Sequence, residues 1–290
     1  MKKPFLVCEI GCNHRGEFDT ALEMIRVAAQ FCDVDAVKFQ KRNNRELLTP
    51  KEFDSPHPNP ENSYGNTYGR HREFLEFDVQ QHKTLKAACE ECGVIYSTSV
   101  WDLTSAKEIV SLSPQFIKVP SAINTDMMVL NYLFSEFSGA IHVSLGMTTS
   151  AESDNIVELA TKRGREKSLV LYHCISGYPV EINQLYLCEI TNLIKQYGRT
   201  VHGIGFSGHH KGIAADISAL TLGAEYFERH FTLDRTWKGT DHAASLEPDG
   251  MRRLVRDLRG ATEALQFKPT EILDIEQVQR DKLKRFRELS

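Results

Sequence analysis

The stretch VHGIGFSGHHKGIAADISALTLGAEYFERHFTLDRTWKGTDHAASLEP, residues 201–248, decides how the rest of the chain folds. Two short apolar runs in it, Val201–Phe206 and Ala224–Phe231, predict buried strands. A segment with helical spacing, Ile213–Thr221, lies between them. Strand, helix and strand in this order predict a parallel pair joined by a crossover helix.

Imidazole and carboxylate groups gather where these two strands end. His209 follows the first strand, and His230 lies near the end of the second. Glu228 precedes His230 by two residues, so strand alternation points both side chains to the same face. Asp241 follows in a glycine-containing loop. Nitrogen and carboxylate ligands from neighbouring strand ends predict a site for a divalent metal.

A competing interpretation makes these histidines ordinary core residues, as a single histidine in an apolar strand usually is. The gathering of four histidines and two acids at strand ends favours a functional site instead. His210 and His242 are the expected bystanders, because each lies beside a better-placed candidate.

The same alternation extends over the whole chain. The other strands are predicted at Phe5–Ile10, Asp35–Phe39, Val94–Thr98, Phe116–Val119, Ile141–Ser144 and Leu169–His173. The other helices are predicted at Glu17–Phe31, Val79–Cys92, Leu103–Leu112, Asp126–Phe137, Ala151–Arg163, Asn183–Tyr197 and Pro248–Leu265. Eight strand–helix units predict a closed (β/α)₈ barrel, a TIM barrel, as one domain over residues 1–267. An open doubly wound sheet is less favoured, because no glycine-rich phosphate turn follows the first strand.

Two segments stand outside this pattern. Residues 41–72 form a long polar insertion rich in Pro, Asn and Gly, which predicts an irregular lid or binding loop. Residues 268–290 form a charged C-terminal tail that is expected to be helical and at the surface.

Composition excludes several classes of protein. The chain has 290 residues, 41% of them hydrophobic, and a formal net charge of −4. No polybasic run is present, so a nucleic-acid partner is not expected. No apolar run approaches the length that crosses a membrane, so no membrane partner is expected. Seven cysteines at irregular spacings indicate reduced thiols and a cytoplasmic location.

The barrel prediction places an active site at the C-terminal ends of the strands. Those ends are polar: Glu9, Asn13, His14, Lys38, Gln40, Thr98, Ser99, Lys118, Ser121, Ser144, His173, Ser176, Tyr178, Ser207, His209, Glu228 and His230. Lys38 and Lys118 each end an apolar strand, where a lysine is unfavourable unless an anion pairs with it. We expect a bound phosphate or carboxylate there, the alternative being lysines that extend to solvent.

Several segments resemble the sialic acid synthase family, which condenses phosphoenolpyruvate with an acylated hexosamine. They are CEIGCNHRG (8–16), DAVKFQ (35–40), STS (97–99), IKVPS (117–121), SLGM (144–147), YHCISGYP (172–179), GFSGHH (205–210), EYFERHFTLD (225–234) and GTDHAASLEP (239–248). Each is weak alone, but together they follow the family order and cover nearly the whole barrel.

The resemblance implies a metal-dependent condensation in a (β/α)₈ barrel. His209 and His230 match the family's metal ligands, for Mn²⁺ or Mg²⁺. The positions that match phosphoenolpyruvate binding are Lys38, Gln40, Thr98, Lys118, Ser121 and Ser207. The positions that match the acceptor side and the reacting carbons are Glu9, Tyr178, Glu228 and Asp241, with Ser176 where the family usually has Asn.

The implied mechanism joins C3 of phosphoenolpyruvate to the aldehyde carbon of an open-chain sugar, whose oxygen is bound by the metal. Glu9 would stabilise the charge that develops at C2 or place the water that adds there. Loss of phosphate then leaves a 2-keto-3-deoxy sugar acid. Glu228 or Asp241 would orient a metal ligand or move protons, a choice that the sequence leaves open.

The departures from the family concern the acceptor. Ile123 replaces an acid and Gly208 a common Asp. We expect a catalytic barrel without the small antifreeze-like C-terminal domain, which in the family supplies an arginine to a partner subunit's site. We expect a homo-oligomer, with another element covering the sugar. A related synthase that makes a 3-deoxy-octulosonate or a non-acylated nonulosonate is the alternative. A non-catalytic barrel is disfavoured by the retained lysines and histidines.

Overall fold

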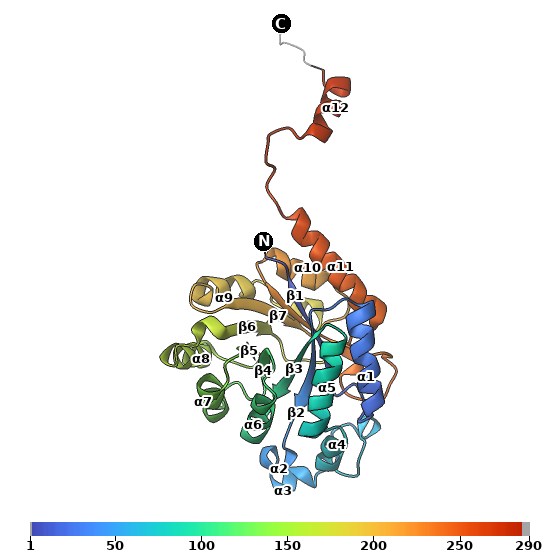
Figure 1. Ribbon diagram of the computed structural model, residues 1–290, viewed down its shortest axis with the longest axis vertical. Helices are drawn as coiled ribbons and strands as arrows, with labels where there is room; N and C mark the ends of the chain where they lie inside the picture. The colour runs from blue at the N-terminus through green and yellow to red at the C-terminus, as the bar shows by residue number, and fades with distance from the viewer. Residues whose placement is uncertain (1, 286–290) are drawn as a thin grey trace.

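The chain forms a closed barrel of eight parallel strands in the order β1 to β8, as the computed structural model, which describes residues 2–285, shows (Figure 1). The strands are β1 Phe5–Gly11, β2 Ala36–Lys41, β3 Ile95–Val100, β4 Phe116–Val119, β5 Ala140–Ser144, β6 Leu169–Cys174, β7 Gly203–Gly208 and β8 Tyr226–His230. The predicted (β/α)₈ barrel is therefore confirmed, and the open sheet is excluded.

Helices cover the outside of the barrel. They are α1 Phe18–Arg26, continued by a π-helical turn at Val27–Phe31, α5 Val79–Glu91, α6 Leu103–Ser111, α7 Met127–Glu136, α8 Ser150–Lys162, α9 Glu189–Tyr197, α10 Ala214–Thr221 and α11 Pro248–Ala264. Side-chain caps from Asp78, Asp102, Asp126 and Thr149 set four of the starts. The predicted start of α9 at Asn183 is wrong. A separate 3₁₀ turn forms at Ile182–Gln184 before the helix begins at Glu189, and the Leu185 carbonyl between them accepts a hydrogen bond from the His173 ring.

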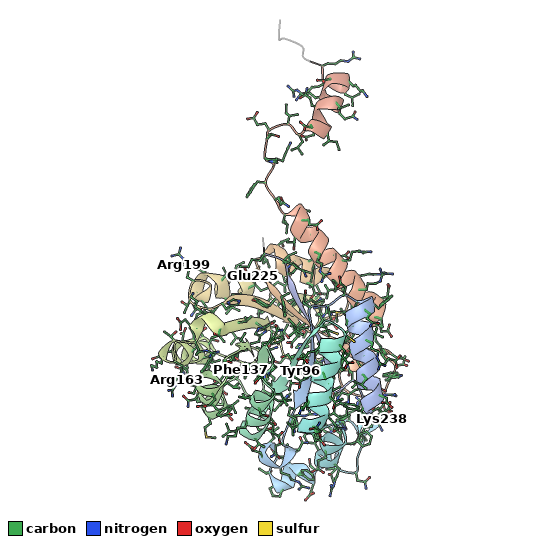
Figure 2. The ribbon with its side chains drawn as sticks, in the orientation of Figure 1. Tyr96, Phe137, Arg163, Arg199, Glu225 and Lys238 are labelled. Carbon is green, nitrogen blue, oxygen red and sulfur yellow. The ribbon has the colours of Figure 1, made fainter. Side chains whose placement is uncertain are left out.

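Aromatic rings fill the N-terminal half of the barrel interior. Phe116 and His142 stack with ring centroids 4.2 Å apart, and the rings of Tyr172 and Tyr226 lie beside them. Outside the strands, Tyr96 of β3 meets His82 of α5 through a 2.8 Å hydrogen bond (Figure 2). The packed lower interior leaves only the C-terminal end of the barrel open for a site.

The insertion at 41–72 is more regular than the sequence indicates. It contains α2 Asn44–Leu47, α3 Pro50–Phe53, a 3₁₀ turn at Pro60–Asn62 and the start of α4 Tyr68–Phe74. The expectation of an irregular loop is therefore wrong. Pro50 begins a helix behind a Thr49 capping box, and Gly69 lets α4 approach the buried Phe53 ring, against which any side chain would clash. Helices α2, α3 and α4 lie at one end of the barrel, and the N-terminus lies at the other (Figure 1).

The C-terminal tail extends away from the barrel beyond α11 and contains α12, Asp274–Leu283 (Figure 1). The predicted surface helix is confirmed within residues 268–285, and residues 286–290 lie outside the described part. No helix among the described residues is long and apolar enough to cross a membrane.

Candidate active site

A cavity of about 460 Å³ opens at the C-terminal ends of the strands, within the size range of ligand pockets. All of the predicted site residues except Thr98 line it. They are Glu9, Lys38, Gln40, Lys118, Ser121, Ser176, Tyr178, Ser207, His209, Glu228, His230 and Asp241. Residues from strands far apart in the sequence are thus brought together in one cavity.

Thr98 points away from the cavity, so the structure does not bring it together with the other predicted site residues. Its hydroxyl lies 3.0 Å from the Tyr96 hydroxyl on the helix-facing side of β3. Ser99, its neighbour, lines the cavity instead and accepts a 2.6 Å hydrogen bond from Lys38. Because strand side chains alternate, a shift of one residue moves a side chain to the other face.

An ion-paired cluster forms the floor of the cavity, comprising Lys38, Lys118, Glu9 and Glu228. Lys38 contacts Glu9 and lies 3.8 Å from Glu228, which accepts a 2.7 Å hydrogen bond from Lys118. Strand register brings Lys38 to Glu9, because Glu9 of β1 lies opposite Lys38 of β2 on one side and His230 of β8 on the other. The alternative of lysines extending to solvent is wrong, since the two lysines are 2% and 1% exposed. Their burial does not require an external anion, because the two glutamates already compensate the charge.

Burial and pairing move the pKa values of this cluster in opposite directions. Burial raises the pKa of Glu9, although Lys38 opposes this. Burial would also raise the pKa of Glu228, but Lys118 and Lys38 outweigh it and hold the pKa below its usual value. Burial lowers the pKa of Lys118. Two carboxyl groups with such different environments can take different proton-transfer roles.

Two imidazoles, His209 and His230, face each other at the rim of the floor cluster, with ring centroids 5.4 Å apart. His209 donates from Nδ1 to the Ile175 carbonyl at 3.1 Å, which leaves its Nε2 with a free lone pair. Burial, and then His230, lower the pKa of His209 to about 3, so the ring is neutral. His230 has a buried Nδ1 without a hydrogen-bond partner, 3.9 Å from Asp241.

This arrangement fits a divalent cation held by two nitrogens, with Asp241 nearby. Within residues 2–285, no group of three or more His, Cys, Asp or Glu side chains forms a cluster that could hold a metal. Water and substrate oxygens would therefore have to complete the coordination, as they do in open catalytic sites. The unpartnered Nδ1 of His230 is the atom that such an ion would satisfy.

Several other polar residues near the strand ends have structural partners outside the cavity. His210 and Asp216 surround the buried Arg229, whose guanidinium also donates to the carbonyls of His210 and Gly212. His242 bonds Thr232 at 2.8 Å. Asn13 donates to the Phe231 carbonyl, and His14 stacks on Phe77. The expected bystander roles of His210 and His242 agree with these contacts.

Apart from Tyr68, which belongs to the insertion expected to form a lid, the sequence analysis missed the residues that line the cavity mouth. One of them follows β2, four come from the insertion and α4, and one follows β3. They are Arg42, His57, Tyr68, His71, Arg72 and Trp101. The density of basic and aromatic side chains in YGRHRE, residues 68–73, was the available signal. Cys12 also lines the cavity, but burial raises its thiol pKa to about 12, so it is not a thiolate.

A parallel barrel with buried lysines, glutamates and histidines at its C-terminal end defines a TIM-barrel enzyme. The NeuB family model matches residues 24–269, and the chain belongs to that family. It is thus a phosphoenolpyruvate-dependent sugar-acid synthase, as the sequence resemblance implied.

Relatives with established names agree with this family. The chain is 33% identical to human N-acetylneuraminate-9-phosphate synthase, over 96% of this chain and 76% of that protein. It is 29% identical to the N,N'-diacetyllegionaminic acid synthase of Campylobacter jejuni, over 91% of this chain and 78% of the relative. A crystal structure of an N-acetylneuraminic acid synthetase from Leptospira borgpetersenii, in complex with citrate, superposes with a TM-score of 0.81 at 25% identity, covering 98% of this chain and 94% of that one.

Proposed function

We propose that this protein condenses phosphoenolpyruvate with an open-chain aldose similar to N-acetylmannosamine, giving a nonulosonate of the sialic acid type and phosphate. The observation that carries the proposal is the juxtaposition of the floor cluster and the imidazole pair in one cavity. The floor cluster offers two fixed ammonium groups as donors to a small polyanion, and the imidazole pair can hold the ion that polarises a carbonyl.

The floor lysines position phosphoenolpyruvate in this proposal. Lys118 is held above the Tyr172 ring at 4.5 Å, and Lys38 is held by Ser99, so both ammonium groups are fixed before the substrate arrives. Fixed donors favour an oriented enol whose C3 faces the aldehyde. Ser121 and Ser207 add hydroxyls around the same position, and the Gly146 amide donates to Ser121 at 3.0 Å.

The two glutamates have different roles in this proposal. Glu9, whose pKa burial raises, can take the proton of the water that adds at C2. Glu228, whose pKa the lysines lower, stays ionised and keeps Lys118 in place. The C2–C3 π electrons form the bond from C3 to the aldehyde carbon as the carbonyl π bond opens, and water oxygen adds at C2. The C2–O bond to phosphate then breaks to leave the C2 ketone, and the two protons of the water pass to the former aldehyde oxygen and to the departing phosphate.

A divalent metal bound by His209 and His230 would supply Lewis-acid polarisation of the aldehyde oxygen. Two nitrogens with a nearby carboxylate favour Mn²⁺ over Mg²⁺, because Mg²⁺ prefers oxygen ligands alone. Tyr178, with its ring 4.3 Å from that of His209, lies at the mouth where the sugar must enter.

Phosphate release from phosphoenolpyruvate tests this proposal, measured across N-acetylmannosamine, mannose, arabinose and their phosphates. Release should require both a suitable sugar and the metal. Release that persists after exhaustive chelation would contradict the metal role, and release with no sugar present would contradict the condensation.

His230→Ala sharpens the same assay. Loss of a metal ligand should lower turnover by at least roughly a hundredfold. It should also weaken Mn²⁺ binding measured by calorimetry without substrates. His202→Ala is the matched control, because His202 is exposed just before β7 and does not line the cavity. Equal turnover of the two variants would show that His230 is only a core residue.

A further inference from the structure

A fully buried arginine lies between two site residues of β8. Arg229 follows Glu228 and precedes His230, so strand alternation directs its side chain to the outer face of the barrel while both neighbours face the cavity. Arg229 is 0% exposed and does not line the cavity. The proposed condensation uses Glu228 and His230 but gives Arg229 no part.

The guanidinium of Arg229 is surrounded by acceptors from the segment after β7. Nη2 donates to the His210 carbonyl at 2.6 Å, and Nη1 donates to the Gly212 carbonyl at 2.9 Å. Nη1 also pairs with the Asp216 carboxylate of α10 and lies 3.2 Å from Nε2 of the His210 ring. Arg229 therefore joins the end of β8 to the chain that leaves β7.

Backbone pairing between the two strands stops before this segment. The last pair in the register of β7 and β8 is Gly208 with Arg229, and His209 lies beyond it. The loop after β6 holds His209 on one side, where the Val180 amide donates to its carbonyl at 3.0 Å and its ring donates to the Ile175 carbonyl. On the β8 side, the Arg229 guanidinium continues the connection where the backbone pairing ends.

The imidazole pair depends on how these two strand ends lie relative to each other. His209 directly precedes the residue whose carbonyl Arg229 holds, and His230 directly follows Arg229. The ring centroids of the two histidines lie 5.4 Å apart. Bonds from ligand atoms to a metal vary by only about 0.2 Å. A small shift between the ends of β7 and β8 therefore weakens the ability of the pair to hold one ion.

The ion pair of Arg229 and Asp216 is poorly explained by stability alone. Both side chains are 0% exposed, and the free energy needed to remove two charges from water is similar to that gained by their attraction. Well-packed apolar residues of similar volume would hold α10 against β8 equally well. They would not bond to the carbonyls of His210 and Gly212, which is what the guanidinium fork adds.

We propose that Arg229 is a positioning residue for the imidazole pair, because its guanidinium fixes the segment after β7 relative to β8 and so sets the separation of His209 and His230. The inference rests on the metal-binding part of the proposed function. Arg229 lies outside the cavity, so it acts through the backbone of the two histidines and contacts neither substrate.

The test is calorimetry of Mn²⁺ binding to the full-length protein without substrates. Arg229→Lys keeps the charge next to Asp216 but loses the fork, so the Kd for Mn²⁺ should rise roughly 10- to 100-fold, as for other groups that orient metal ligands. The number of sites per chain should stay the same. A purely structural role predicts the reverse, because incomplete folding removes sites and leaves the Kd of the folded chains unchanged.

Two further variants complete the test. Arg165→Lys is the matched control, because Arg165 also donates to a backbone carbonyl, that of Gly139 at 2.7 Å, and does not line the cavity. The double variant Arg229→Met/Asp216→Leu removes both buried charges, so it should fold even if Arg229→Lys does not, and its Kd should rise in the same way.

The remaining outcomes are also decisive. An unchanged Kd in a folded Arg229 variant, an equal rise in Arg165→Lys, or the failure of both Arg229 variants to fold would overturn the inference. If the wild-type protein binds no Mn²⁺, the metal role fails, and crystal structures of the wild-type protein and a folded Arg229 variant decide. An equal separation of the His209 and His230 rings in the two would overturn the inference. If Mn²⁺ binds as expected but no sugar releases phosphate, the condensation fails and the inference stands.

Discussion

The floor and the mouth of the cavity are built in different ways. Floor side chains come from the strands, are almost completely buried and neutralise one another. Mouth side chains come from α4 and from the residues after β2 and β3, and they are held mainly by aromatic contacts and by Glu76. The strands hold one arrangement rigidly, whereas the mouth depends on an insertion that can differ between proteins with the same barrel.

The difference has a functional consequence. Every catalyst of this reaction must hold the same phosphoenolpyruvate, so a rigid and self-compensated floor suits the constant substrate. The acceptor is the variable substrate, and an insertion with an uncompensated charge suits its selection. Floor changes should therefore cost stability and all activity, and mouth changes should alter acceptor preference.

The largest effect is expected for Lys118→Met. Removal of this ammonium group leaves Glu228 buried without its closest partner, which should lower the free energy of unfolding by about 3–5 kcal/mol. The KM for phosphoenolpyruvate should rise strongly if the variant folds. Denaturant unfolding and steady-state kinetics measure the two effects.

The double variant Lys118→Met/Glu228→Gln separates the two contributions. It should regain much of the stability, because no uncompensated charge stays in the floor, but not the activity. If Lys118→Met alone is as stable as the wild-type protein, the Lys118–Glu228 ion pair does not contribute to the free energy of unfolding.

A change in pH should have a smaller effect on stability, through the neutral imidazole of His142 below the floor cluster. Burial, and then Lys118, lower the pKa of His142 to about 3, and its Nδ1 lies 2.9 Å from the Tyr172 hydroxyl. The unfolded chain takes up a proton near pH 6.5 but the folded chain does not, so stability falls as pH drops from 6.5 toward 3. The loss should be about 1.4 kcal/mol per pH unit for each such histidine. Unfolding midpoints that are equal at pH 7 and pH 5 would contradict this.

The smallest effect is expected at the mouth, for Tyr64→Phe. The Tyr64 hydroxyl donates to the carbonyl of Lys238, which joins the insertion to the loop after β8 near α4 (Figure 2). Loss of one such bond costs about 0.5–1.5 kcal/mol, so kcat/KM for the acceptor should fall by roughly 2- to 10-fold. Stability should hardly change. Tyr186→Phe is the control, at an exposed ring that does not line the cavity. A loss of stability without a change in acceptor kinetics would count against a lid function for the insertion.

Local sequence patterns were sufficient for the barrel and for much of the floor. Eight apolar runs separated by helical spacing predict the fold, because each strand must be buried on both faces. Alternation placed Glu228 and His230 on one face without knowledge of any neighbour. Thr98 was assigned from the family resemblance instead, and nothing local in STS shows which of its hydroxyls faces inward.

Only the tertiary structure decided which charges meet. The pairing of Lys38 with Glu9 depends on the register between β1 and β2, and the pairing of Lys118 with Glu228 spans 110 positions in the sequence. The sequence alone therefore determined which groups reach the barrel end. It could not determine that Arg72 has no carboxylate partner among the described residues, because only folding brings an opposite charge within a few ångströms of a side chain.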